Sequence, residues 1–73
     1  MTNADLLEHA IEQSGIKKNA LAKMLNITPQ SLYNKINNLT KFNQQEMGLL
    51  KKWLKLSPED FDAIFFATEV NSK

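Results

Sequence analysis

Residues 18–37, KNALAKMLNITPQSLYNKIN, carry the most informative pattern in the chain. Their apolar side chains recur three and four positions apart, the spacing of an amphipathic α-helix, and the pattern is interrupted near Asn26. Asparagine tolerates the left-handed backbone conformation that ends many helices, and Thr28-Pro29 is a typical helix start. The stretch therefore predicts two short helices, over residues 18–25 and 28–37, joined by a tight turn.

The second of these helices is expected to expose one polar face. Ala22 is small enough to let the two helices approach closely, and Leu32 and Ile36 share the face that packs inward. The opposite face carries side chains that form hydrogen bonds without carrying a charge, namely Gln30, Ser31, Tyr33 and Asn34. Glutamine and asparagine amides pair well with the edge of adenine. The face is therefore a candidate for reading bases, and the alternative is an ordinary solvated surface.

The flanking segments continue the helical pattern. Gly15 stands where a left-handed helix stop is needed, Asn43 with Glu46 resembles a capping box, and Ser57-Pro58 is a clear helix start. We therefore expect a single all-α domain over residues 1–73, with helices over about 3–14, 18–25, 28–37, 44–55 and 58–68, followed by a polar tail over 70–73.

Composition excludes several classes of site. The chain has 73 residues, no cysteine and one histidine, His9, so disulfides, thiolate zinc sites and two-histidine metal sites are absent. No nucleophile–base pair or glycine-rich phosphate loop is visible, and we expect no enzyme activity, cofactor, metal or small-molecule substrate. Apolar runs are far too short to span a bilayer, and the N-terminus lacks a signal-type stretch. We expect a cytoplasmic protein without a membrane partner.

Charge is distributed unevenly although the net charge is only +1. Residues 1–12 carry three acids and no lysine, and residues 13–45 carry five lysines and no acid. Residues 46–73 carry five acids and four lysines. A basic middle between acidic ends suits an anionic partner, but so few charges can also be distributed this way by chance.

Together, the helix pair, the loop Asn37-Asn38-Leu39-Thr40-Lys41-Phe42 and the closing pattern from Glu46 to Phe66 resemble the Cro/phage-repressor family, also described as lambda repressor-like or XRE-type. The resemblance covers about residues 4–67. It departs at Asn26, where the family usually has glycine, and at Lys18-Asn19, where many members have Thr-Gln. Arginine is absent, so bidentate arginine–guanine contacts are impossible.

This resemblance implies a five-helix, lambda repressor-like domain with a central helix-turn-helix. It implies a small transcriptional regulator, of phage or mobile-element origin, that places residues 28–37 in the major groove of double-stranded DNA. Base edges would be met by Gln30, Ser31 and Asn34. Phosphates or other groove atoms would be met by Lys18, Asn19, Thr28, Tyr33, Lys35, Asn38, Lys41 and Gln44.

Several apolar side chains lie outside the helix pair. Leu39 and Phe42 are expected to plug the core from the loop between the third and fourth helices. Phe66 cannot face the same core as its neighbour Phe65, since successive helical residues are about 100° apart. It is expected to form a homodimer contact, with Trp53 or Leu49. The alternative function is a protein-interaction module, such as an antirepressor or antitoxin-like partner, that uses the hydrophobic fifth helix.

Overall fold

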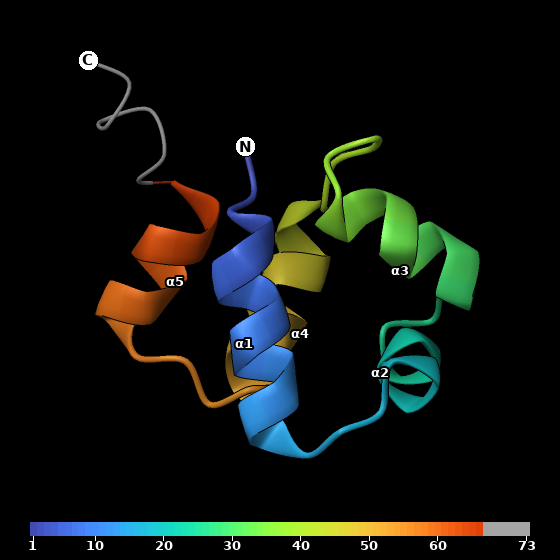
Figure 1. The fold of residues 1–73 in the computed structure, drawn as a ribbon, viewed down its shortest axis with the longest axis horizontal. Coiled ribbons are helices and arrows are strands. Elements are labelled where there is room, and N and C mark those ends of the chain that lie inside the picture. The colour runs from blue at the N-terminus through green and yellow to red at the C-terminus, as the bar shows by residue number, and fades with distance from the viewer. Residues whose placement is uncertain (67–73) are drawn as a thin grey trace.

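Five α-helices and no strand make up residues 1–66, the part of the chain that the computed structural model describes (Figure 1). The predicted all-α, five-helix architecture is confirmed for these residues. The predicted tail over 70–73 and the last positions of the predicted fifth helix lie outside them. The helices are α1 (Ala4–Ser14), α2 (Lys18–Met24), α3 (Pro29–Ile36), α4 (Gln44–Trp53) and α5 (Pro58–Phe65).

Four of these helices begin at a polar side chain that accepts a hydrogen bond from the backbone of the first turn; the capping residues are Asn3, Thr28, Asn43 and Ser57. Asn43 and Glu46 form the expected capping box, with the Glu46 carboxylate accepting from the Asn43 N–H at 3.0 Å. In α2, the residue before the helix is Lys17, whose side chain makes no capping hydrogen bond in the described structure. These local hydrogen bonds satisfy N–H groups that a helix start otherwise leaves unpaired.

Left-handed residues end the first four helices. Gly15 and Asn26 adopt this conformation as expected, with φ of 76° and 62°. Asn38 and Lys55 adopt it as well, with φ of 67° and 55°. The prediction that the fourth helix continues to residue 55 is therefore wrong at its end. The Leu56 N–H donates to the Lys51 carbonyl at 3.0 Å, a hydrogen bond that ends the helix. The Leu56 side chain is buried in the core.

The core receives apolar side chains from all five helices. Its largest fully buried side chains are Leu7, Leu21, Leu32, Ile36 and Leu50. From the loop after α3, Phe42 is buried and packs edge-to-face against Phe65, with 5.8 Å between ring centroids. Leu39, in contrast, is 69% exposed, so the prediction that it plugs the core is wrong. The Leu39 N–H donates to the Asn34 carbonyl at 2.8 Å in the turn that ends α3. The next side chain to enter the core is Phe42, three residues later.

Two short helices, α2 and α3, pack against one another at one side of the molecule. Ala22 is completely buried, and its carbonyl accepts a hydrogen bond from the Ile27 N–H at 2.9 Å. The small side chain thus lets the turn fold back closely, as the sequence predicts. Figure 1 shows α3 and α5 at opposite sides, with α1 and α4 between them. Among the described helices, none is both long and apolar enough to cross a membrane.

Candidate nucleic-acid interface

One face of α3 is buried and the other meets solvent. Leu32 and Ile36 are each 1% exposed, and they hold the helix against the core. Gln30 and Tyr33 are exposed, while Ser31 and Asn34 are half-buried beside them. The polar face predicted from the sequence is therefore accessible from solvent on a helix that the core holds in place.

Gln30 and Asn34 are joined by a hydrogen bond on this face. The Gln30 Nε2 donates to the Asn34 Oδ1 at 3.0 Å, as expected for amides one helical turn apart. The bond leaves the Gln30 Oε1 as an acceptor and the Asn34 Nδ2 as a donor. Base edges in the major groove present both complementary groups, so the paired amides form a small recognition surface.

Thr28 caps α3 and can also donate a hydrogen bond to DNA. Its Oγ1 accepts a hydrogen bond from the Ser31 N–H at 3.0 Å, which caps the helix. Because the oxygen acts there as an acceptor, the hydroxyl hydrogen can still be donated to a phosphate. A shallow hollow between α2 and α3 brings Thr28 together with Asn19 and Lys23. Lys23 was not among the predicted site residues; its place beside the hollow depends on how the two helices pack.

Three further predicted phosphate contacts are exposed. Lys18 pairs with Glu8 at 2.7 Å, and both side chains are about half exposed. Such surface ion pairs contribute about 0–1 kcal/mol, so a phosphate can replace Glu8 at little cost. Lys41 lies in the loop after α3, and Gln44 is the first residue of α4. The structure thus places these side chains on three separate segments around α3.

Lys35 is directed into the protein. Its ammonium lies 2.9 Å from the Glu46 Oε1 and 3.1 Å from the Lys41 carbonyl oxygen. The side chains of Lys35 and Glu46 are only 15% and 9% exposed. An ammonium held by a carboxylate and a carbonyl has little capacity left for DNA, so this placement argues against Lys35 as a contact residue.

Asn38 is also occupied within the protein. Its side-chain amide donates to the Thr2 carbonyl and accepts from the Thr2 N–H, both at 2.9 Å. This reciprocal pair ties the N-terminal segment to the loop after α3, and the Asn3 N–H bonds to the Ile64 carbonyl at 2.7 Å nearby. The geometry argues against Asn38 as a phosphate contact. No sequence signal indicates the partner, because Thr2 lies 36 residues away.

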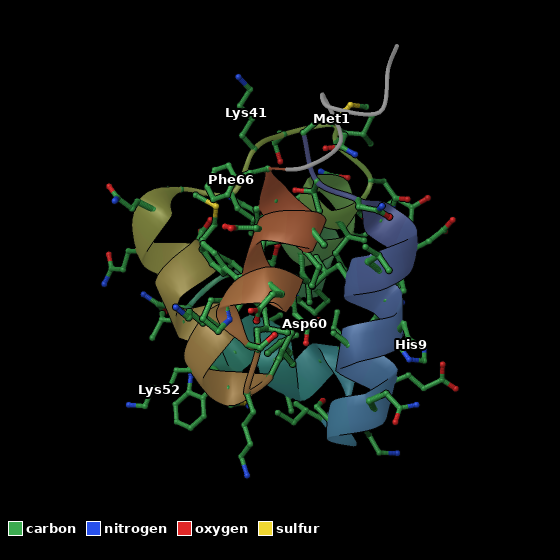
Figure 2. All side chains as sticks on the ribbon, turned by 90° about the vertical axis from the view of Figure 1, so that its left-hand side faces the viewer. Met1, His9, Lys41, Lys52, Asp60 and Phe66 are labelled. Atoms are coloured by element: carbon green, nitrogen blue, oxygen red, sulfur yellow. The ribbon has the colours of Figure 1, made fainter. Side chains whose placement is uncertain are left out.

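The predicted dimer residues do not form one patch. Phe66 is 52% exposed at the end of α5, and it lines a largely apolar hollow with Met1, Phe42 and Met47, to which the polar residues Thr2, Asn38 and Lys41 also contribute. Figure 2 shows Met1, Lys41 and Phe66 at one end of the molecule and Lys52 at the other. Trp53 lies with Lys52, whose ammonium sits 5.1 Å from the indole ring centroid. Phe66 and Trp53 therefore belong to different surfaces.

Among residues 1–66, no group of histidine, cysteine, aspartate or glutamate side chains is arranged to hold a metal ion. His9, the single histidine, is exposed on α1. The exposed polar surface of α3 is the candidate functional site.

A family model described as bacterial regulatory protein, Fis family, matches residues 2–39. The match covers just over half of the chain and includes α1, α2 and α3. No curated protein and no solved structure gives a match. The sequence-based assignment to the Cro/phage-repressor family is therefore wrong. Two short helices joined by a tight turn occur in many DNA-binding families, so the residues that carried that resemblance do not distinguish one family from another.

Proposed function

The chain belongs to the bacterial regulatory protein, Fis family, and we propose from this premise that α3 is the helix with which it reads double-stranded DNA. The family assignment identifies a helix-turn-helix domain that binds DNA in transcription regulation. A domain of this kind is not enzymatic. The finer proposal concerns which side chains meet the duplex. It rests above all on the exposed, hydrogen-bonded pair of Gln30 and Asn34.

Base recognition falls to the outward face of α3. Gln30, Asn34 and Ser31 lie along one accessible strip, and their neighbours Leu32 and Ile36 keep the helix firmly on the core. A helix of this kind fits the major groove, where each base pair presents its own arrangement of donors and acceptors. The hydrogen bond between the two amides limits their rotation before DNA arrives, which reduces the entropy lost on binding.

Phosphate contacts come from the segments around α3. The proposed set omits Lys35 and Asn38, which Glu46 and Thr2 hold against the protein. It consists of exposed polar residues, namely Lys18, Asn19, Thr28, Tyr33, Lys41 and Gln44. Such contacts fix the position of the protein on the duplex and carry little sequence information. They also make the affinity depend strongly on salt.

We further propose that two copies bind together. Phe66 beside its largely apolar hollow offers a projecting ring and a depression on one surface, which could make that surface complementary to a second copy of itself. Two copies would read half-sites about one helical turn apart. Sedimentation would test this: Phe66→Asp should yield monomers, and Leu6→Asp, at an exposed apolar residue of α1, should leave the association unchanged.

The same observation supports a second candidate function. An exposed Phe66 at an apolar hollow also suits a protein-interaction module of the antirepressor or antitoxin-like kind. In that case, the double change Gln30→Ala and Asn34→Ala leaves function intact, whereas Phe66→Asp abolishes it. The DNA-reading proposal expects the amide changes to remove sequence preference.

Selection of binding sites from random duplex DNA, followed by measurement of affinity against salt, tests the main proposal. We expect an enriched sequence, and Gln30→Ala should cost about 1–3 kcal/mol on it and relax the preference at one base pair. Gln13→Ala on α1 is the matched control, since it removes an exposed amide far from α3 in the sequence. If Gln30→Ala weakened random and selected duplexes equally, Gln30 would not read bases.

A further inference from the structure

An ion pair between a half-buried lysine and a buried glutamate joins the last turn of α3 to the first turn of α4. The Lys35 ammonium and the Glu46 carboxylate are 2.9 Å apart. Glu46 is the one charged residue that is buried among those described. The pair lies directly beside the proposed recognition surface, since Lys35 follows Asn34 in the chain.

The same two side chains also hold the loop between α3 and α4. The Glu46 Oε1 accepts a second hydrogen bond from the Asn43 N–H at 3.0 Å, and the Asn43 Oδ1 accepts from the Glu46 N–H at 2.7 Å. The Lys35 ammonium donates in addition to the Lys41 carbonyl at 3.1 Å. One small network therefore fixes the end of α3, the loop and the start of α4 to one another.

This network connects the two kinds of proposed DNA contact. The proposed base contacts, Gln30 and Asn34, lie on α3. The proposed phosphate contacts Lys41 and Gln44 lie in the following loop and at the start of α4. Base reading requires both sets to meet one duplex in register, because phosphate contacts determine where the recognition helix lies in the groove. An interaction that sets their relative position therefore affects sequence preference without touching DNA.

We propose that Lys35 and Glu46 are positioning residues for sequence-specific DNA binding, an inference that rests on the function proposed above. A buried ion pair is weak evidence for stability, because the loss of hydration offsets much of the attraction between the charges. Such a pair does restrict geometry, since both charges must remain together. In this chain, the restricted geometry is the angle and distance between α3 and the loop that carries Lys41.

The test uses full-length variants at both ends of the pair. Glu46→Gln removes the charge but keeps an oxygen that can accept from the Asn43 N–H, because glutamine also serves in capping boxes. Lys35→Met keeps most of the aliphatic stem and removes the ammonium. The double variant leaves no unpaired charge at this site, so it can be measured even if one of the single variants fails to fold. Lys41→Met, at an exposed neighbouring lysine, is the matched control.

Affinity for a selected and a random duplex is measured for each variant over a range of salt concentrations, with thermal unfolding as the check on folding. We expect Glu46→Gln and Lys35→Met each to lower the preference for the selected duplex by roughly tenfold, comparable to one lost base contact. The double variant should lose no more than either single variant, because the two residues act as one unit. The salt slope should stay unchanged, whereas Lys41→Met should flatten it by about one unit on both duplexes.

Two results would overturn the inference. A change in preference and salt slope for Lys35→Met alone would make Lys35 a direct phosphate contact. Unchanged preference in all three variants, with the wild type still selective, would show that the pair has no positioning role. If the wild type itself selected no sequence, the proposed function would fail first, which separates that failure from the failure of this inference.

Discussion

Two asparagine turns, one at each end of α3, share the same backbone design and differ in what surrounds them. At the first, Asn26 is left-handed, its N–H bonds to the Lys23 carbonyl at 3.0 Å, and the Ile27 N–H bonds to the Ala22 carbonyl at 2.9 Å. At the second, Asn38 is left-handed, its N–H bonds to the Lys35 carbonyl at 3.3 Å, and the Leu39 N–H bonds to the Asn34 carbonyl at 2.8 Å. Both are Schellman turns followed by an apolar residue.

The apolar residue that follows each turn has a different environment. Ile27 is partly buried and packs against the core. Leu39 is 69% exposed, and the second turn is held by the pair of hydrogen bonds between Asn38 and Thr2. The first turn is therefore held mainly by apolar packing and the second mainly by polar contacts to a distant segment. Identical local chemistry does not determine which kind of support a turn receives.

The largest expected effect is at Asn38. Asn38→Ala should lower the free energy of unfolding by roughly 3–4 kcal/mol, since it combines left-handed backbone strain of about 1–2 kcal/mol with the loss of two hydrogen bonds of about 1 kcal/mol each. Chemical denaturation measures the loss. Asn38→Gly separates the two contributions, because glycine carries no strain there. A loss below about 0.5 kcal/mol for Asn38→Gly would mean that the bonds to Thr2 contribute nothing.

Removing the apolar support of the first turn should have the next largest effect. Ile27→Ala is expected to cost about 2 kcal/mol, at the lower end of the range for buried aliphatic truncations, because Ile27 is only partly buried. Thermal unfolding checks the value. A cost near zero would contradict the conclusion that packing supports this turn.

The helix start that follows the first turn should contribute less. Thr28→Ala removes the hydroxyl that accepts from the Ser31 N–H and should cost about 1 kcal/mol. Thr28→Ser keeps the hydroxyl and should cost clearly less, so the pair of variants isolates the cap. Equal losses in the two variants would assign the effect to the methyl group instead.

Truncating the apolar residue of the second turn should have the smallest effect. Leu39→Ala should change the free energy of unfolding by less than about 0.5 kcal/mol, as for most exposed side chains. Comparison with Ile27→Ala under identical conditions is the direct test of the difference between the turns. A loss as large as that of Ile27→Ala would mean that Leu39 is buried in solution.

Features that depend on neighbouring residues could be predicted from the sequence. Helix starts at Thr28, Asn43 and Ser57 and the turn at Asn26 were predictable, because a cap or a left-handed stop forms its hydrogen bonds within three to five positions. The small Ala22 likewise indicated close helix packing. The family was not predictable in this way, since the helix-turn-helix pattern is shared by many families.

Within the candidate site, the chemistry of the α3 face follows from local sequence alone, because the 3.6-residue period separates Gln30 and Asn34 from the buried Leu32 and Ile36. Which of the remaining polar side chains are available depends on contacts between segments that are distant in the chain. Lys35 meets Glu46 across 11 positions and Asn38 meets Thr2 across 36. Such partners are set by how the helices pack, and they hold the Lys35 and Asn38 side chains against the protein instead of leaving them directed at a phosphate.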